Sequence, residues 1–315
     1  MTTASAAASG WNPERLPRQD GKTFVVTGGH AGIGYWVSEQ LARAGARVVI
    51  AGRTPKKLTA ARDAILARKP DALVDGVRLD LASLASVREA AEELSALPRI
   101  DGLLENAGTV MASRKREETA DGFESMFGVN HLGHFLLTAL LYPRIRSSGG
   151  RVVTMGSGAT RLTKIRLDDL QSTEGKFSAW RAYGQSKHAT QAFGFELDRR
   201  LRAAGSPATA LVAHPGAVRD GTTPKRRGVI EPTIRQRLAD HTIFFITRGK
   251  DVGAWPMVRA ATDPAAEGGQ YWGPRGFGSG QPRLNTPVEI DRSPELGREL
   301  WARSEEWVGE EFVVD

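Results

Sequence analysis

The sequence predicts an α/β fold in which a doubly wound parallel sheet carries helices on both faces. Two observations lead to this prediction. Short apolar, β-branched runs alternate with stretches of helical periodicity, and the runs are nearly continuous in apolar character, as in strands buried on both faces. No Pro-, Gly- or Ser-rich linker divides the 315 residues, so a single domain is expected despite the length.

Strand and helix alternate through the first two-thirds of the chain. The first predicted helix begins near Ile33 and ends at Gly45, a residue suited to a helix terminus. Apolar strands are predicted at 22–29, 46–53, 74–81, 100–108, 151–157 and 207–216. Helices are predicted, from apolar residues recurring every three or four positions, at 33–44, 55–68, 86–96, 123–142 and 183–202.

The last third of the chain departs from this alternation and is expected to form a substrate lid and a C-terminal extension. The lid is placed at about 217–248, directly after the sixth strand. Helical spacing follows at 251–262, and a strand-like piece lies in the glycine-rich loop 268–280. Ser293 as the N-cap and Pro294 at the first helical position predict a final helix. The residues expected to face inward from that helix are Leu296, Leu300 and Trp307.

Composition excludes several kinds of chemistry. The chain has no cysteine, which rules out disulfides, a thiolate nucleophile and Cys-based metal or iron–sulfur sites. No apolar run reaches 18 residues, so no membrane span is expected. Residues 1–16 lack a basic start and an apolar core, so we expect a disordered or extended tail rather than a signal peptide, and a cytoplasmic protein.

The formal net charge of +7 raises the question of nucleic-acid binding. The basic residues are scattered, the densest run is 225–227, and no base-reading helix or aromatic RNA-binding box accompanies them. A solvated basic surface with no nucleic-acid partner is therefore expected. His131 and His134 lie three apart without a third ligand at metal spacing, so we expect packing or hydrogen bonding and no metal site.

A glycine-rich turn stands between the first strand and the first helix. Gly28 would permit the tight turn, Gly32 the close approach of a pyrophosphate, and Gly34 the close packing of the helix on the sheet. The free N–H groups of the helix N-terminus would then bind phosphate, although an ordinary glycine-rich turn is the alternative. The residues of this turn expected to hold a dinucleotide are Gly28, His30, Gly32, Ile33 and Gly34.

The end of the second strand bears on the choice of dinucleotide. An NAD site would place an acidic residue here for the ribose 2′-hydroxyl, but the sequence reads Ala51-Gly52-Arg53. Arg53 can instead bind the 2′-phosphate of NADP through a charge-assisted contact. NADP(H) is therefore favoured over NAD(H), the alternative being that Arg53 only opens a surface loop.

Tyr183 and Lys187 lie four apart on a predicted helix, which places them on one face, and Ser157 ends the strand 151–157. A tyrosine needs its phenolate stabilised to exchange a proton near neutrality, and a neighbouring lysine and a positively charged nicotinamide would stabilise it. Ser157 could hydrogen-bond a carbonyl oxygen that gains charge during hydride transfer.

These motifs together resemble the short-chain dehydrogenase/reductase family. The resemblance covers about residues 17–310, and the phrases at 130–135 and 182–187 are most similar to its retinol dehydrogenase and protochlorophyllide reductase-like branch. It implies a Rossmann-type NAD(P)-binding domain over 17–315 and an oxidoreductase that interconverts carbonyl and alcohol. Tyr183 matches the family's general acid/base, Ser157 its substrate-orienting hydroxyl, and Lys187 its ribose-binding lysine that lowers the tyrosine pKa.

The resemblance implies further site residues. Asn130 matches the asparagine that holds a proton-relay water, and Asp80, with Leu81 beside it, matches the acidic residue that flanks the adenine. The residues matching the remaining cofactor contacts are Asn106, Ala107, Gly108, Pro215, Gly216 and Val218. The family also implies a homodimer or homotetramer built through helix faces, one of which the C-terminal extension could block.

Two positions depart from the family pattern. Glu105 stands where a second Asn is usual, and we expect it to be tied to a basic neighbour or to sit at the strand end. Asp220 stands where Thr is frequent in the family, and the nearby Thr222 and Thr223 are the candidates to replace that threonine in its contact with the nicotinamide carboxamide. The effects of both departures on activity are open.

The lid bears on substrate class. It combines apolar residues with a basic set, which suggests a sizeable apolar alcohol or carbonyl compound, with or without an acidic handle. The alternative is a lid whose apolar side faces the sheet and whose charges face water. The apolar residues are Ile230, Ile234, Ile243, Phe244 and Phe245, and the basic ones are Lys225, Arg226, Arg227, Arg235 and Arg237.

Two function classes remain at this point. One is an NADP(H)-dependent oxidoreductase acting on a small-molecule carbonyl or alcohol. The other is a dinucleotide-binding scaffold or sensor that does no chemistry. The presence of Asn130, Ser157, Tyr183 and Lys187 together favours the enzyme, because a scaffold has no need of them. Since one fold serves many substrates, the sequence does not name this one.

Overall fold

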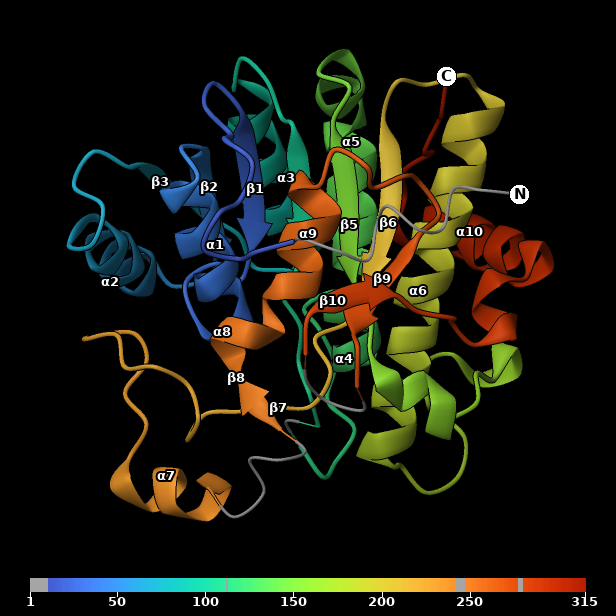
Figure 1. Ribbon diagram of the computed structural model, residues 1–315. Helices are drawn as coiled ribbons and strands as arrows, with labels where there is room; N and C mark the ends of the chain where they lie inside the picture. Colours follow the sequence, from blue (N-terminus) through green and yellow to red (C-terminus); the bar gives the residue numbers. More distant parts are fainter. Residues whose placement is uncertain (1–10, 112, 242–246, 277–279) are drawn as a thin grey trace, which may run out of the picture.

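The computed structural model describes residues 11–111, 113–241, 247–276 and 280–315. Its centre is an eight-stranded sheet in the order β10-β9-β6-β5-β4-β1-β2-β3, parallel except for β10 (Figure 1). The strands are β1 (Thr23–Thr27), β2 (Arg47–Gly52), β3 (Leu73–Arg78), β4 (Gly102–Glu105), β5 (Arg151–Met155), β6 (Thr209–Ala213), β9 (Tyr271–Pro274) and β10 (Pro282–Leu284). The chain order reverses between β1 and β4, which creates the switch point where such sheets bind ligands.

Helices cover both faces of the sheet, which confirms the predicted fold class (Figure 1). One layer is built on α1, α2 and α9, and the other on α3, α5 and α6, with α10 packed outside α6. The helices are α1 (Gly32–Arg43), α2 (Pro55–Leu66), α3 (Leu84–Ser95), α4 (Ser125–Phe127), α5 (Gly133–Ser147), α6 (Ala179–Ala203), α7 (Ile234–His241), α8 (Lys250–Gly253), α9 (Trp255–Thr262) and α10 (Pro294–Val308).

Burial explains why the inner strands are nearly continuous apolar runs. All five residues of β1 are buried, with Val25 facing the α5 layer and Phe24 and Val26 facing the α1 layer. The edge strand β3 differs, because only Val74 and Val77 of its six residues are buried. Its polar positions face solvent, as expected at a sheet edge.

The long helix predicted at 123–142 is interrupted. The short α4 leads into a π-helical turn, Gly128–Leu132, before α5 begins. α5 then continues through Pro143 to Ser147, beyond the predicted end. α6 begins at Ala179 rather than 183, because the Ser178 side chain accepts a hydrogen bond from the Arg181 N–H and caps the helix. The helix predicted at 251–262 is divided into α8 and α9.

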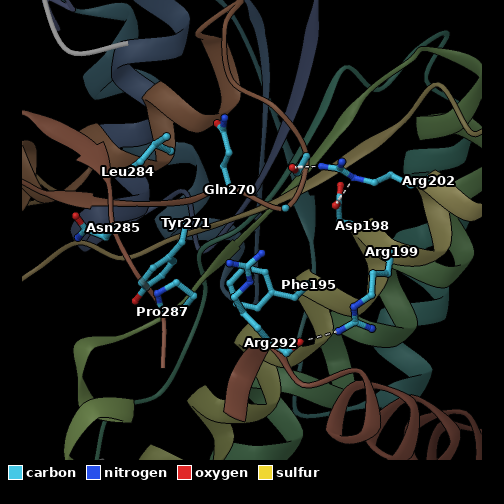
Figure 2. Close-up of a pocket in the computed structure, with 12 residues that line it drawn as sticks. Phe195, Asp198, Arg199, Arg202, Gln270, Tyr271, Leu284, Asn285, Pro287 and Arg292 are labelled. Carbon is cyan, nitrogen blue, oxygen red and sulfur yellow. Dashed lines mark hydrogen bonds and ion pairs between the residues drawn. The ribbon is translucent and has the colours of Figure 1, made fainter. Parts of the chain in front are cut away.

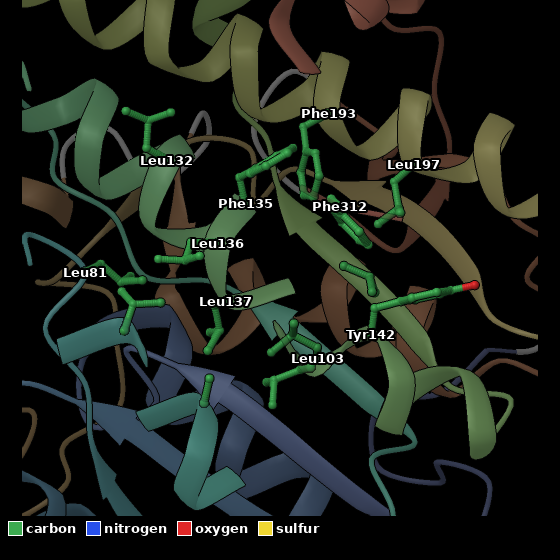
Figure 3. Close-up of a cluster of buried hydrophobic side chains, with 14 of the residues drawn as sticks. Leu81, Leu103, Leu132, Phe135, Leu136, Leu137, Tyr142, Phe193, Leu197 and Phe312 are labelled. Carbon is green, nitrogen blue, oxygen red and sulfur yellow. The ribbon is translucent and has the colours of Figure 1, made fainter. Parts of the chain in front are cut away.

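The C-terminal extension completes the core on the α5–α6 side. Ser293 caps α10 as predicted, with its hydroxyl 3.2 Å from the Leu296 N–H. Phe312 stacks on Trp301 with ring centroids 4.7 Å apart and contacts the Phe135 and Tyr142 rings (Figure 3). Leu296 and Leu300 are buried, whereas Trp307, also predicted to face inward, is only half-buried. This face of the molecule is covered by the chain's own end.

The N-terminal segment also differs from the prediction. Residues 1–10 lie outside the described residues, but Trp11 and Leu16 pack against the core, and Trp11 contacts the Trp255 ring at 6.0 Å. Residues 11–16 are therefore part of the body rather than of a disordered tail. Among the described helices, none is both long and apolar enough to cross a membrane.

Candidate active site

A cavity of about 1650 Å³ opens at the carboxyl ends of the parallel strands. Every predicted site residue lines it except Gly34 and Asn130, which lie just behind its wall. Residues that follow six strands thus meet in one place, as expected where parallel strands end at the same edge. The predicted residues that line it are Gly28, His30, Gly32, Ile33, Arg53, Asp80, Leu81, Asn106, Ala107, Gly108, Ser157, Tyr183, Lys187, Pro215, Gly216 and Val218.

The glycine turn has the geometry that a phosphate site needs. Gly28 and Gly32 have φ values of 65° and 55°, a region that favours glycine. A Cβ at Gly34 would lie 2.4 Å from the Gly28 carbonyl oxygen, so α1 packs closely only without a side chain there. The α1 N-terminus has no side-chain cap and no acidic residue in its first turn, which leaves its N–H groups directed at the cavity. These residues fit a dinucleotide pyrophosphate.

The end of β2 carries a cluster of basic groups. Arg53 is exposed at the cavity edge, and the half-buried His30 ring lies against Gly52. Burial lowers the pKa of His30, and the positive charges of Lys57 and Arg53 lower it further. Two cations therefore surround the place where a ribose 2′-substituent would lie. Lys57 was not among the predicted site residues.

Thr27 holds the segment that follows β4, although no local motif marks this residue in the sequence. The Ala107 N–H donates to its hydroxyl at 3.0 Å, and that hydroxyl lies 2.9 Å from Nε2 of His134. The Asn106 side chain donates to the Thr27 carbonyl at 2.9 Å and so supports the glycine turn from below. Asp80 accepts from the Ala82 N–H at 3.0 Å, which holds the turn after β3.

The candidate catalytic side chains meet at the ends of β5 and α6. The Tyr183 hydroxyl donates to Ser157 Oγ at 3.2 Å, and Lys187 Nζ donates to the Met155 carbonyl at 2.8 Å. Tyr183 and Lys187 are buried one turn apart on α6, as their spacing predicts. Ser157 also accepts from the Ala159 N–H at 3.2 Å, which makes it the cap of the short 3₁₀ helix η3 (Gly158–Leu162).

Burial and hydrogen bonding act in opposite directions on Tyr183. Burial raises the pKa of Tyr183, and its hydrogen bond to Ser157 lowers that pKa. The Lys187 ammonium donates to the Met155 carbonyl. The lowering of the Tyr183 pKa by Lys187 and a bound nicotinamide stays a prediction.

Asn130 lies in the π-helical turn with its side-chain groups engaged. Its Oδ1 accepts from the Thr109 N–H at 2.8 Å, and its Nδ2 donates to the Thr109 carbonyl and to Ser186 Oγ. Its backbone carbonyl accepts from Thr190 Oγ1 at 3.0 Å and lies 3.2 Å from Nδ1 of His134. The amide therefore fixes the loop after β4.

Glu105, the first departure from the family pattern, is buried beneath the site at the end of β4. Its Oε1 accepts a hydrogen bond from Thr138 on α5, and its Oε2 has no partner among the described residues. Burial raises the pKa of Glu105 to about 8. Burial lowers the pKa of Lys187 to about 8, and the charge of Glu105 acts in the opposite direction on it. The basic neighbour anticipated for Glu105 is thus Lys187.

Asp220, the second departure, does not line the cavity. It forms an ion pair with Lys250 at 2.6 Å. The Thr223 hydroxyl, the suggested replacement, is buried, donates to the Arg219 carbonyl at 2.7 Å and accepts from the Lys250 N–H. It therefore ties the lid to α8. Thr222 does not line the cavity either.

The lid contains short strands β7 (Val218–Arg219) and β8 (Arg248–Gly249) and the helix α7, which stands apart from the body (Figure 1). Arg226, one of the basic lid residues that could have bound an acidic handle on the substrate, instead pairs with buried Glu39 at 2.6 Å and stacks 4.1 Å above the Trp36 ring. Ile230 is buried, whereas Ile234 is 78% exposed. The apolar residues Ile243, Phe244 and Phe245 lie outside the described residues.

The mouth of the cavity is apolar. Of the ten large hydrophobic side chains that the described part of the chain exposes, five line this cavity. Clustered exposed apolar groups mark a binding surface rather than ordinary surface scatter. These five are Val110, Met111, Leu162, Trp180 and Leu284.

His131 and His134 are both buried. His131 Nε2 lies 2.8 Å from Ser304 Oγ of α10, and its ring contacts Phe127 and Phe193. Burial lowers the pKa values of both to about 3. Each thus takes the packing or hydrogen-bonding role that the sequence suggests. The described residues contain no cluster of His, Asp and Glu suited to a metal ion.

A second, smaller hollow of about 510 Å³ lies beyond the β9–β10 edge (Figure 2). Its charged residues largely satisfy one another: Arg202 pairs with Asp198 at 2.7 Å, and Arg199 donates to the Arg292 carbonyl. Leu284 and Asn285 line both hollows and form the wall between them.

Comparison with known proteins places the chain in a family. The family model for short chain dehydrogenases matches residues 22–228. The chain belongs to the short-chain dehydrogenase/reductase family. It is 38% identical over 300 residues to mouse polyprenol dehydrogenase, covering 93% of this chain and 85% of that protein. It is 35% identical over 293 residues to human retinol dehydrogenase 13, covering 92% and 85%.

Solved structures agree with this assignment. An uncharacterised protein from Mycobacterium paratuberculosis shares 35% identity with a TM-score of 0.78, covering 97% of this chain and all of that one. The Pseudomonas aeruginosa RhlG/NADP active-site complex shares 25% identity with a TM-score of 0.60, covering 81% and 95%. Family and relatives together make the chain an oxidoreductase of the retinol dehydrogenase-like branch.

Proposed function

We propose that the protein is an NADP(H)-dependent oxidoreductase that interconverts an apolar carbonyl compound and its alcohol at the Tyr183 site. The observation that carries the proposal is the convergence of Ser157, Tyr183 and Lys187 on the cavity that the glycine turn also lines. When bound, NADPH would supply the hydride.

In the reducing direction, the Tyr183 hydroxyl donates a proton to the substrate oxygen as that oxygen gains charge. Its hydrogen bond to Ser157 at 3.2 Å places both hydroxyls where one carbonyl oxygen could accept from each. Lys187 brings a buried positive charge beside the site, which favours the phenolate that proton transfer leaves behind. Asn130 acts by holding the Thr109 backbone, rather than through a free amide.

The preference for NADP(H) rests on charge. Arg53 and Lys57 surround the end of β2, and no acidic residue follows this strand to bind a 2′-hydroxyl. Apart from Lys187, the charged residues lining the cavity include one acid, Asp80, against six bases. These bases are Arg53, Arg161, Arg219, Lys250, Arg275 and Arg283. Such a cavity attracts a polyanionic cofactor.

The preference for an apolar substrate rests on the five exposed hydrophobic side chains at the mouth. The relatives named for polyprenol and retinol fit this preference. An acidic handle on the substrate is not supported by Arg226, which is committed to Glu39.

The test of the reaction is NADPH consumption with farnesal and with retinal. Tyr183→Phe removes the proton donor but keeps the ring, so we expect kcat to fall by at least about a hundredfold. The Kd for NADPH, measured by fluorescence titration, should change less than about twofold. Turnover undiminished by the substitution would refute the mechanism. Tight NADPH binding by a wild-type protein without turnover would favour the non-catalytic scaffold.

The test of cofactor choice is Arg53→Asp. Replacing the cation by a carboxylate should repel a 2′-phosphate and can accept from a 2′-hydroxyl, so kcat/KM for NADPH should fall about a hundredfold or more relative to that for NADH. Lys22→Asp, a charge change away from the cavity, serves as the control and should leave the ratio unchanged. An unchanged ratio in the Arg53 variant would mean that Arg53 does not read the cofactor.

A further inference from the structure

Asp291 is a fully buried carboxylate that lies far in sequence from the proposed catalytic residues. It nevertheless contacts α6, the helix that carries Tyr183 and Lys187. Asp291 lies in the 3₁₀ turn η5 (Glu289–Arg292) of the C-terminal extension and is 0% exposed. A buried carboxylate persists only where donors satisfy it. Both of its oxygens have such partners, and both partners lie on α6.

The two partners are His188 and Gln191. His188 Nδ1 lies 2.5 Å from Asp291 Oδ1, and Gln191 Nε2 donates to Asp291 Oδ2 at 2.5 Å. His188 directly follows Lys187, and Gln191 is one turn farther along the helix. Both side chains are buried. Asp291 therefore fixes two side chains of the helix that carries Tyr183 and Lys187.

Each partner then holds the short η3 turn that follows Ser157. Gln191 Nε2 donates to Thr160 Oγ1 at 3.1 Å, and that hydroxyl donates to the Ser157 carbonyl at 3.1 Å. His188 Nε2 lies 3.2 Å from the Thr163 carbonyl at the other end of the turn. The turn itself orients the serine, because the Ala159 N–H donates to Ser157 Oγ.

Packing leaves this segment little freedom. A Cβ at Gly156 would lie 2.4 Å from Gln191 Oε1, so the backbone before Ser157 rests directly on the Gln191 side chain. The C-terminal segment is also tied down around Asp291. Arg161 of η3 donates to the Thr286 carbonyl at 2.6 Å, and Arg199 donates to the Arg292 carbonyl (Figure 2).

We propose that Asp291 is a positioning residue for the catalytic serine: through His188 and Gln191 it holds the 158–163 turn that orients Ser157, so the C-terminal extension forms part of the active site. This inference rests on the proposed function, since it gives Ser157 a role in turnover. Asp291 itself does not line the cavity and acts only through the residues it holds.

The test compares Asp291→Asn with Glu196→Gln. The asparagine keeps the shape but removes the charge, and its single amide oxygen can accept from only one of the two partners. Glu196 is a matched control, because it is a buried carboxylate on α6 that accepts from Arg200 at 2.9 Å and packs on Gly297 of α10. Among the described residues, no hydrogen bond links Glu196 to the 158–163 turn. Both variants loosen the contact between α6 and the C-terminal extension.

With NADPH and farnesal, we expect Asp291→Asn to lower kcat about tenfold or more, because a small misplacement of a catalytic group is costly. The KM for NADPH should stay within about twofold. Glu196→Gln should leave kcat within about twofold of wild type, even if it lowers the Tm by as much as Asp291→Asn does. Equal kcat values for the two variants would overturn the proposal.

A double-mutant cycle separates positioning from general damage. If Asp291 acts through Ser157, Asp291→Asn should change kcat by less than about twofold in a Ser157→Ala background. A full tenfold loss in that background would overturn the proposal. If Asp291→Asn fails to fold, Thr160→Val removes the hydroxyl that links Gln191 to the Ser157 carbonyl and should still lower kcat several-fold. An unchanged kcat in that variant would overturn the route through Gln191.

Amide hydrogen exchange measures the same link without turnover. Exchange across 157–163 should accelerate in Asp291→Asn and not in Glu196→Gln, and equal exchange in both would overturn the link. A wild-type protein that never oxidises NADPH would instead refute the proposed function, while the exchange result would still decide whether Asp291 holds the turn.

Discussion

At the scale of single residues, two buried groups, Glu105 and Lys187, lie at the candidate site, and the sequence predicts their environment only in part. Glu105 can be recognised as a departure from the family pattern, but its depth cannot be read from its neighbours. In the structure Glu105 is buried below the site and accepts a hydrogen bond from Thr138. Because the negative charge of Glu105 raises the pKa of Lys187, we expect the protonation states of the two groups to be linked.

Glu105→Gln should move the pH profile of the enzyme. Glu105 raises the pKa of Lys187, so removing its charge lets burial lower that pKa further below about 8. If charged Lys187 is required for turnover, the basic limb of kcat/KM should move to lower pH by on the order of one unit. Thr138→Val is the matched control, since it removes a hydrogen bond but keeps the carboxyl. A basic limb that stays in place would contradict the coupling.

The same variant has a stability signature with a defined sign. The folded-state pKa of Glu105, about 8, lies above its ordinary value of 4.5. The folded wild type therefore holds the proton more tightly than the unfolded chain, and its stability falls as pH rises from about 4.5 to about 8. Glu105→Gln lacks this fall, so its free energy of unfolding relative to wild type should increase over that window. Urea unfolding at pH 5 and pH 8 measures the difference.

At the scale of elements, helices and strands marked by local sequence signals were predicted well. Elements that depend on contacts with residues distant in sequence were not. The apolar runs located strands β1 to β6, and Ser293-Pro294 located the start of α10, because these signals lie within a few residues. The π-helical turn at Asn130 and the edge strand β10 escaped prediction. Both depend on partners distant in sequence: Thr109 and Ser186 for Asn130, and β9 for β10.

The lid is a second case in which the sequence does not reveal a long-range contact. Its basic residues look alike in sequence, but in the structure Arg226 pairs with buried Glu39, whereas Lys225 is exposed. Arg226→Ala should lower the free energy of unfolding by about 3 kcal/mol, since it leaves the buried Glu39 carboxylate without its main partner. Lys225→Ala, which loses only an exposed pair with Glu231 at 3.8 Å, should cost less than about 0.5 kcal/mol. Urea unfolding of the two variants, read side by side, provides the check. Equal losses would mean that Arg226 does not anchor the lid.

At the scale of the whole molecule, the C-terminal extension is the feature whose role the sequence left open. It adds β9 and β10 to the sheet and places Trp301 and Phe312 against the aromatic side chains of α5 and α6 (Figure 3). On this side of the molecule the surface of α5 and α6 is thus covered by the chain's own C-terminal segment.

The site as a whole could be predicted because it consists of short motifs that follow strands, and parallel strands deliver their ends to one edge. The supporting residues could not, because Thr27, His188, Gln191 and Asp291 carry no local motif. Their roles depend on which segments the fold brings together. Sequence pattern therefore predicts the reacting groups better than the groups that hold them.

The central claim, hydride transfer to a carbonyl at the Tyr183 site, is tested most directly by isotope transfer. NADPH deuterated at C4 of the nicotinamide, in each of its two epimers, is incubated with the enzyme and farnesal, and the alcohol is analysed by mass spectrometry. One epimer should deliver one deuterium to the former carbonyl carbon, and Tyr183→Phe should abolish the product. An alcohol without deuterium from either epimer, or labelled product formed equally by Tyr183→Phe, would contradict the account.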